Sequence, residues 1–174
     1  LQSGELTNFL EKCKKDGIEF DVVINAVGYT GSHNVDDAES EKDLCWHLNV
    51  TFPSMLAKVV NDFKIKKLIH ISSGCIFDKG NKAWTEFDVP NFGMFDDASS
   101  FYSRSKHACE LLLSHTYNNV YNIRIRMPLG EIVSNRNLLQ KLLKYEAWLN
   151  CDNSVTYIYD LFNFVYNTII TDDI

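Results

Sequence analysis

A tyrosine and a lysine four residues apart are the strongest candidates for chemistry in this sequence. The segment Tyr102-Ser-Arg-Ser-Lys106 falls in a stretch with helical spacing, so both side chains lie on one face of a helix. An ammonium group beside a phenol stabilises the phenolate and lowers the pKa of the phenol from about 10. Such a tyrosine can donate a proton to a carbonyl group that is being reduced. An exposed helix pair has the same spacing, so the interpretation depends on the surroundings.

Other polar residues stand where buried strands are expected to end. Ser73 closes the apolar segment 66–74, where its hydroxyl can meet a substrate carbonyl, although turn formation is the alternative. Asn25 and Gly28 close the apolar segment 20–28, which is also compatible with an ordinary strand-to-loop turn. Asn49 lies within a long helical stretch. Each of these residues is ordinary alone. Together they occur in the order, and at the strand ends, that one fold requires for a single site.

Strands and helices alternate along the chain. Helical patterns are expected up to Gly17 and over 36–63 (with a break near Pro53), 100–117, 135–148 and 160–170. Strands are expected over 20–28, 66–74, 119–128 and near Val155, and a polar loop over 75–99. This alternation predicts an α/β fold with a parallel sheet. In such sheets the carboxyl ends of the strands line the ligand cleft, so 25–28, 72–75 and 127–130 should converge.

The glycine pattern of a dinucleotide-binding loop is missing. A G-x-G-x-x-G turn normally seats the pyrophosphate at a helix N-terminus, but only Gly28-x-x-Gly31 is found, after a later strand. The first expected element is also a helix. We therefore expect residues 1–174 to form a single but partial Rossmann-like domain that lacks the glycine-rich strand-helix unit and part of the C-terminal substrate region.

Composition weighs against several classes of protein. The formal net charge of −6 disfavours nucleic acid and anionic membranes as partners, and no apolar run has the roughly 18 residues of a membrane helix. Five cysteines without a C-x-x-C pair and five scattered histidines predict neither a disulfide framework nor a metal site. Reduced thiols favour a cytoplasmic protein.

The order of the motifs NAVG, Asn49, ISSG, YSRSK and RMP resembles the extended short-chain dehydrogenase/reductase family. The resemblance implies that Ser73 orients a substrate carbonyl, Tyr102 donates the proton and Asn49 supports the proton relay. It implies that Lys106 lowers the pKa of Tyr102 and binds the nicotinamide ribose. The cofactor would be NADP(H), with NAD(H) as the alternative, and its remaining contacts would be Asn25, Ala26, Val27, Gly28 and Pro128.

A second series of segments gives a narrower resemblance. GYTGSHNVDDAESEK, SSGCIFD, TEFDVPNF, SFYSRSK, RIRMPLGE and NRNLLQKLLKYE resemble, in this order, the bifunctional 3,5-epimerase/4-keto-reductases that make UDP-L-rhamnose from UDP-4-keto-6-deoxyglucose with NADPH. That family has Thr where this chain has Ser73, and both supply a hydroxyl. A homodimer is a compatible assembly. The resemblance implies that the nucleotide sugar contacts Thr30, His33, Asn34, Glu86 and Asn91; helix capping by Asn34 and a polar surface loop around Glu86 are the alternatives.

Two further residues belong to this narrower resemblance. Epimerisation removes protons beside the C4 ketone and returns them on the other face, which needs an acid/base pair in addition to the reducing tyrosine. The resemblance assigns this pair to Cys75 and Lys141, and the related GDP-fucose synthase has a cysteine at the place of Cys75. A small buried thiol and a solvated lysine are the alternative interpretations.

Two other functions remain open. A 4-keto-reductase similar to dTDP-4-dehydrorhamnose reductase would need Tyr102 but neither Cys75 nor Lys141. A non-catalytic, nucleotide-binding regulatory subunit, such as that of methionine adenosyltransferase, is built on the same fold. The complete set of Ser73, Tyr102 and Lys106 favours an enzyme, because a regulatory subunit need not keep all three.

Overall fold

The computed structural model of the chain describes residues 3–32, 34–78, 83–131, 137–147, 150 and 152–170. The chain forms two compact units, Leu1–Ile123 and Arg124–Ile174. The first unit carries most of the residues that the motifs single out. The expected single domain over 1–174 stays a prediction.

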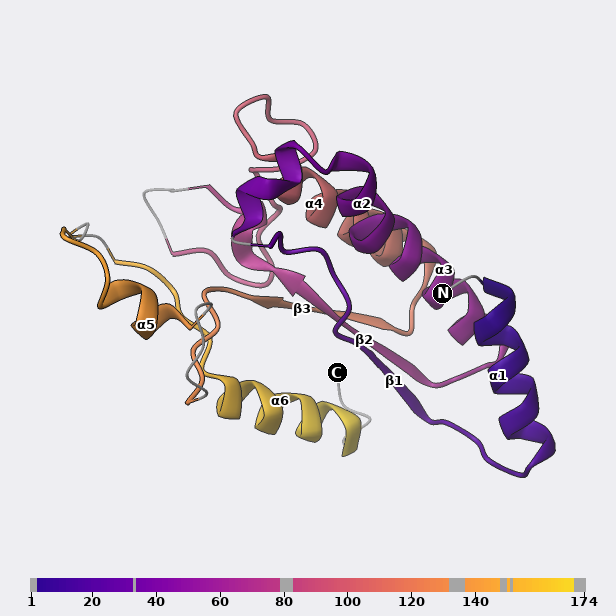
Figure 1. Cartoon of the computed structure of the whole chain (residues 1–174). Helices are drawn as coiled ribbons and strands as arrows, with labels where there is room; N and C mark the ends of the chain where they lie inside the picture. The colour runs from indigo at the N-terminus through magenta and orange to yellow at the C-terminus, as the bar shows by residue number, and fades with distance from the viewer. Residues whose placement is uncertain are drawn as a thin grey trace. The chain divides into compact units, whose positions relative to one another are not determined.

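A three-stranded sheet organises the first unit (Figure 1). Its strands are β1 (Val22–Asn25), β2 (Lys67–Ser73) and β3 (Val120–Ile125), in the order β1-β2-β3. β1 and β2 are parallel, and their register places Asn25 opposite His70. The predicted α/β fold with a parallel sheet is confirmed, and each of the three strands lies inside its expected range.

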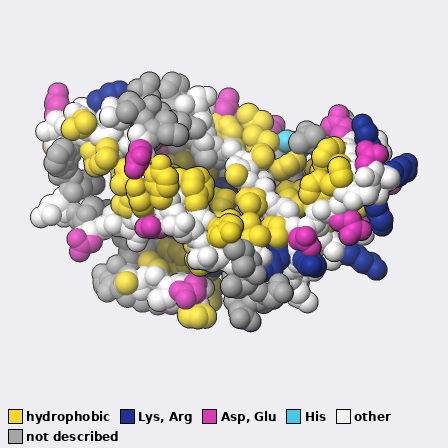
Figure 2. Space-filling model, turned by 90° about the horizontal axis from the view of Figure 1, so that it is seen from below, with side chains coloured by type: hydrophobic (Ala, Val, Ile, Leu, Met, Phe, Trp, Pro, Cys, Tyr) yellow, Lys and Arg dark blue, Asp and Glu magenta, His cyan; other side chains and the backbone are white. Residues whose placement is uncertain are grey.

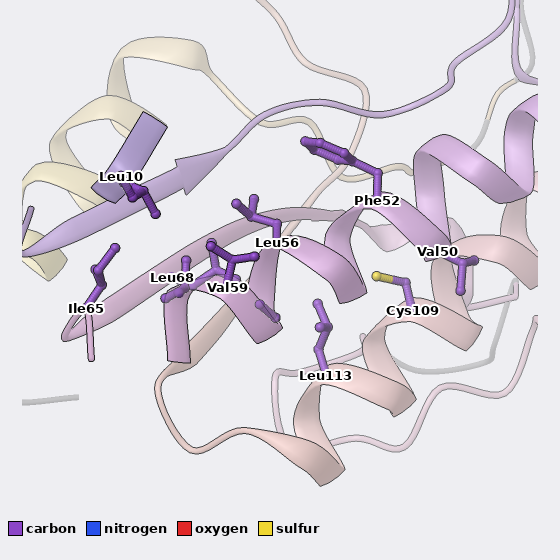
Figure 3. Close-up of a cluster of buried hydrophobic side chains, with 11 residues drawn as sticks. Leu10, Val50, Phe52, Leu56, Val59, Ile65, Leu68, Cys109 and Leu113 are labelled. Atoms are coloured by element: carbon purple, nitrogen blue, oxygen red, sulfur yellow. The ribbon is translucent and has the colours of Figure 1, made fainter. Parts of the chain in front are cut away.

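Helices pack on one face of this sheet through the larger of two hydrophobic clusters (Figure 3). The helices are α1 (Ser3–Lys15), α3 (Phe52–Asp62) and α4 (Phe101–Thr116). Leu68 of β2 points into the core. Because side chains alternate along a strand, His70 and Ser72 face the same helices. The buried core residues are Leu10, Val50, Phe52, Leu56, Ala57, Val59, Val60, Ile65, Leu68, Cys109 and Leu113.

The stretch predicted as one helix over 36–63 consists of four helical pieces. A 3-10 helix η1 (Val35–Glu39) comes first, and α2 (Lys42–Trp46), the π-helix η2 (His47–Thr51) and α3 then follow without a gap. The break therefore lies at residues 40 and 41, and the prediction of a break near Pro53 is wrong. Pro53 occupies the first turn of α3, where a missing N–H is tolerated. The wider turn η2 ends just before it.

The expected polar loop 75–99 begins with a short 3-10 helix, η3 (Gly74–Ile76), and is irregular over 83–99. Its end is fastened to α4. The Met94 N–H donates to Nδ1 of His107 (3.1 Å), and the Arg104 guanidinium donates to the Asp97 carbonyl (2.9 Å). Gly93 packs so closely that an added Cβ would lie 2.6 Å from the His107 ring. The loop therefore enters α4 at a fixed position.

The side of β1 away from these helices is less covered than that of β2, where Ile69 is fully buried. Large hydrophobic side chains remain exposed (Figure 2). In the first unit they include Ile24 and Val27, which are 49% and 46% exposed. Ile24 alternates with Val23, which packs against the core, so the two faces of β1 have different surroundings.

The second unit contains two helices, α5 (Leu138–Leu142) and α6 (Ile158–Ile170). α5 is much shorter than the helix predicted over 135–148. The strand predicted near Val155 is reduced to one parallel bridge between Leu129 and Tyr157. α6 agrees with the predicted helix 160–170. Among the helices that the structure describes, none is long and apolar enough to cross a membrane.

Candidate active site

The N-terminal end of α4 buries both members of the tyrosine–lysine pair. Tyr102 is 6% exposed and Lys106 is 4% exposed. Two groups hold this end of the helix: the Ser100 hydroxyl accepts from the Ser103 N–H (3.2 Å), and the Glu39 carboxylate accepts from the Phe101 N–H (2.7 Å). These contacts satisfy N–H groups that a helix start leaves without a partner. The helix therefore presents Tyr102 from a well-anchored first turn.

Ser73 meets Tyr102 at the end of β2. Its hydroxyl hydrogen-bonds to the Tyr102 phenol and accepts from the Cys75 N–H (3.2 Å). Burial raises the pKa of Tyr102 to about 12, and the hydrogen bond from Ser73 acts in the opposite direction. Ser73, and not Lys106 as expected, is the group that acts to lower this pKa, and burial outweighs it. At neutral pH Tyr102 is therefore a protonated phenol that can act as a proton donor.

Lys106 lies under the loop that follows β1. Its Nζ donates to the Ile71 carbonyl (3.4 Å), and burial lowers its pKa from the usual value. A Cβ added to Gly28 would lie 3.2 Å from this Nζ and 3.2 Å from Oδ1 of Asn49. The close approach explains why glycine suits this position. It also brings the backbone of the β1 loop beside the buried lysine, as the resemblance expects.

Asn49 joins the β1 loop to α4. Its Oδ1 accepts from the Tyr29 N–H (2.7 Å), and its Nδ2 donates to the Ser105 hydroxyl (3.0 Å). Ser105 in turn donates to the Tyr102 carbonyl (2.7 Å). Asn49 and Ser105 are fully buried. The Asn49 side chain thus connects the loop after Gly28 to the turn of α4 that carries Tyr102. Asn49, which was expected to support the proton relay, therefore makes contacts that position Tyr102.

The Asn25 side chain points into the protein. It is 2% exposed, its Oδ1 accepts from the Val27 N–H (3.1 Å), and its Nδ2 contacts Nδ1 of His70 (2.9 Å). Ala26 and Val27 are exposed. The accessible groups of this loop are therefore those of residues 26–28, and the Asn25 amide supports them from below.

These residues fit the nicotinamide-ribose end of a dinucleotide. The evidence is the open backbone at Gly28 beside a buried ammonium, together with the exposed Ala26 and Val27. Lys106 can donate hydrogen bonds to ribose hydroxyls. The sequence shows no glycine-rich turn for the pyrophosphate.

Cys75 packs against the small cluster that contains Tyr102. Its side chain is partly exposed, and its proximity contributes to the raised pKa of Tyr102. The structure therefore brings together Ser73, Cys75 and Tyr102, as the spacing of the SSGC segment predicted.

The predicted substrate residues of the first unit lie on its surface. Thr30, Asn34, Glu86 and Asn91 are exposed, whereas His33 lies outside the described residues. Asn34 caps η1, because its Oδ1 accepts from the Asp36 N–H (2.8 Å). Oδ1 of Asn91 accepts from the Asp78 N–H (3.1 Å). The capping alternative for Asn34 is thus observed, and the sugar contacts remain predictions.

The last two predicted site residues belong to the second unit. Pro128 is exposed and follows Met127, which has a positive φ of 44°. Lys141 lies on α5, whose first turn is capped by the Asn137 side chain. Their roles stay predictions. Within the described part of the chain, no group of three or more His, Cys, Asp or Glu side chains is arranged to hold a metal ion.

Three supporting residues were not foreseen from the sequence: Tyr29, His70 and Ser105. His70 carried a signal, since it is a polar residue within the otherwise apolar segment 68–71. Tyr29 donates to the Glu41 carboxylate, and this contact raises the pKa of Tyr29 to about 12. Such partners come from distant segments, so spacing along the chain does not reveal them.

Comparisons with known proteins give one consistent family. The sequence model of the RmlD substrate binding domain matches residues 5–160. A bifunctional dTDP-4-dehydrorhamnose 3,5-epimerase/dTDP-4-dehydrorhamnose reductase of Arabidopsis thaliana is 37% identical over 147 residues, which cover 80% of this chain and 46% of the relative. A trifunctional UDP-glucose 4,6-dehydratase/epimerase/reductase of the same plant is 35% identical and is covered to 21%.

Solved structures agree with these sequence matches. The UDP-rhamnose synthase of Acanthamoeba polyphaga mimivirus has a TM-score of 0.81 at 25% identity, covering 97% of this chain and 59% of that chain. The dTDP-4-dehydrorhamnose reductase of Bacillus anthracis, solved with NADP, has a TM-score of 0.72 at 21% identity and shows the shared fold. The chain spans about half or less of the length of the curated relatives it matches.

Proposed function

Because the chain belongs to the family of the RmlD substrate binding domain, we propose that it forms the catalytic side of a 4-keto-reductase for a nucleotide sugar of rhamnose synthesis. The observation that carries the proposal is the contact of Ser73 with a buried, protonated Tyr102 one helical turn before the buried Lys106. The names of the relatives, which are epimerases and reductases of rhamnose synthesis, support the choice of substrate class.

The residues of the site suit proton delivery to a ketone. Ser73 donates a hydrogen bond to the C4 carbonyl oxygen, and Tyr102 transfers its proton to the same oxygen. Bound NADPH supplies the hydride to C4. The phenolate that remains on Tyr102 is stabilised by the ammonium of Lys106 on the same helix face. Residues 26–28, Lys106 and Pro128 would hold the nicotinamide nucleotide.

We further propose that the same protein epimerises C3 and C5 before reduction, with UDP-4-keto-6-deoxyglucose as the substrate and UDP-L-rhamnose as the product. Hydrogens next to a ketone are acidic because the resulting enolate places its charge on the C4 oxygen, where Ser73 and Tyr102 can donate hydrogen bonds. Cys75 packs beside Tyr102 and acts as one acid/base group. The similarity of the NRNLLQK segment supports Lys141 as the other. At each carbon one proton leaves from one face and one returns on the opposite face.

The test supplies the full-length protein with UDP-4-keto-6-deoxyglucose and NADPH in deuterated water. The proposal predicts UDP-L-rhamnose that carries solvent deuterium at C3 and C5. In the Cys75→Ala variant, epimerisation and rhamnose formation should fall by about 10²–10⁴-fold, as for the loss of an acid/base group. Cys13→Ala is the matched control, because Cys13 lies in α1, and it should leave the product unchanged.

The outcomes separate the two parts of the proposal. Rhamnose formation that survives Cys75→Ala would refute the epimerase role of Cys75. Reduction without exchange at C3 and C5 in the wild-type protein would favour the simpler dTDP-4-dehydrorhamnose reductase-like function. Binding of NADPH without turnover of the ketosugar would favour the regulatory subunit.

A further inference from the structure

A buried histidine beneath the site connects the cofactor loop to the catalytic helix. His70 lies in the middle of β2, is 1% exposed, and stands opposite Asn25 in the strand register. Its Nδ1 is 2.9 Å from Nδ2 of Asn25, and its Nε2 is 3.7 Å from Sγ of Cys109 on α4. The imidazole therefore contacts two different elements with its two nitrogen atoms.

The contacts of Asn25 determine which nitrogen of His70 carries the proton. Oδ1 of Asn25 accepts from the Val27 N–H (3.1 Å), so its Nδ2 is the group that faces the histidine. An amide nitrogen only donates, and Nδ1 of His70 must therefore accept. The proton then sits on Nε2 and points to the Cys109 sulfur. Reversing the tautomer would place two donors against each other.

The surroundings keep the imidazole neutral. Burial lowers the pKa of His70 to about 3, and the positive charge of Lys106 acts in the same direction. Cys109 also faces the ring, and burial raises the pKa of its thiol to about 12. At neutral pH the His70 imidazole, the Asn25 amide and the Cys109 thiol are thus all uncharged. Asn25 donates to His70, and His70 donates towards Cys109.

These contacts lie directly behind residues 26–28, the loop that follows β1. The Asn25 amide is held by His70 on one side and accepts from the Val27 N–H on the other. Gly28 comes next, and its backbone approaches Lys106, which lies one helical turn before Cys109 on α4. His70 is therefore placed to fix the loop 26–28 relative to the lysine.

We propose that His70 is a positioning residue for the nicotinamide-ribose end of the cofactor site, acting through Asn25 on the backbone of residues 26–28. The inference rests on the proposed function, since it assumes that this loop binds NADP(H). His70 itself touches neither cofactor nor substrate in this arrangement. Its effect should be confined to the nicotinamide half of the cofactor.

Two ligands separate this role from general stabilisation. NADPH uses both ends of the cofactor site, whereas adenosine 2′,5′-bisphosphate uses only the adenosine end. In the full-length protein, His70→Leu should weaken NADPH binding by about tenfold, the loss expected when a buried donor is left unsatisfied. Binding of the bisphosphate should stay unchanged. Leu68→Ala, in the same strand, is the control that removes core packing without touching Asn25, and it should leave the ratio of the two dissociation constants unchanged.

A second pair of variants decides the question if His70→Leu does not fold. In His70→Asn the side-chain oxygen replaces the Nδ1 acceptor, so NADPH affinity should be retained. In His70→Gln the polar atoms lie near the Nε2 position, so the affinity should fall. Equal NADPH affinities of the Asn and Gln variants, or a His70→Leu ratio like that of Leu68→Ala, would overturn the role of His70. A wild-type protein that binds the bisphosphate but not NADPH would instead refute the proposed function.

Discussion

At the scale of single residues, the chemistry depends on the proton of Tyr102. Its pKa is raised to about 12 because the phenol is buried, and Ser73 is its direct hydrogen-bond partner. A protonated donor is what reduction of a ketone requires. The sequence motif identified the residue, while its protonation state follows from burial that the motif does not contain.

Replacing Tyr102 by phenylalanine tests this role. The ring and its packing remain, but the transferable proton is lost, so ketosugar reduction should fall by about 10²–10⁴-fold. NADPH binding should persist, because Lys106 and the loop 26–28 are unchanged. Steady-state kinetics and a fluorescence titration with NADPH provide the two readouts. The control is Tyr117→Phe, at the C-terminal end of α4, which should retain activity; full activity of Tyr102→Phe would contradict the assignment.

The buried His70 should make the folded chain sensitive to acid. Its pKa falls from 6.5 to about 3 on folding, so between these values the unfolded chain binds a proton that the folded chain does not. Stability should therefore decrease as the pH falls from 6.5 towards 3, by up to about 1.4 kcal/mol per pH unit from this group. Urea unfolding between pH 7 and 5 measures the slope.

The slope due to His70 is isolated by comparison. His70→Asn should reduce the pH dependence of the free energy of unfolding over this range. His115→Asn, at an exposed position near the end of α4, is the matched control variant. Identical slopes in the wild type and His70→Asn would show that folding does not lower the pKa of His70.

At the scale of elements, side-chain contacts between distant segments determine how α4 meets the β1 loop. Ser105 joins them, since its hydroxyl accepts from Asn49 and donates to the Tyr102 carbonyl. Ser105→Ala should lower the free energy of unfolding by about 1–3 kcal/mol, because buried polar groups lose their partner. Chemical denaturation measures this loss. Ser114→Ala, at an exposed position on the same helix, should change stability by less than about 0.5 kcal/mol; equal effects would show that the Ser105 contacts contribute little.

The elements that could be predicted from the sequence are those with a strong local pattern. The strands β1 and β2 and the helices α1, α4 and α6 follow from apolar periodicity, although β1 is only partly buried. The division of residues 35–62 into four helical pieces could not be predicted from this periodicity. The π-helix before Pro53 and the break at residues 40 and 41 depend on packing against α4 and the β1 loop. The helix predicted over 135–148 is limited to Leu138–Leu142.

In the candidate site, too, some residues could be predicted from local patterns and others could not. The hydroxyl, phenol and ammonium groups were identified from motifs at strand and helix ends. The residues that position these groups are His70, Tyr29 and Ser105. Each of them hydrogen-bonds to a residue at least 12 positions away in the sequence. A pattern of residue types cannot specify such partners before the strand register is known. The inward orientation of Asn25 is the clearest case.

At the scale of the whole molecule, the first unit contains the sheet, the helices packed on it and the Ser73–Tyr102–Lys106 set, with Tyr102 in a second, smaller hydrophobic cluster. The second unit contains Pro128 and Lys141, and the family match extends across both units. The account therefore assigns proton delivery to the first unit and proposes that the second contributes to cofactor and substrate contacts.

The most direct test of the central claim follows a hydrogen atom from the cofactor to the sugar. NADPH deuterated at both C4 positions of the nicotinamide is supplied with UDP-4-keto-6-deoxyglucose to the full-length protein, and the product is examined by mass spectrometry and NMR. We predict one deuterium at C4 of the 6-deoxysugar in the wild type, and incorporation about 10²–10⁴-fold slower with Tyr102→Phe. A sugar product without deuterium at C4, or NADPH that is bound but not consumed, would contradict it.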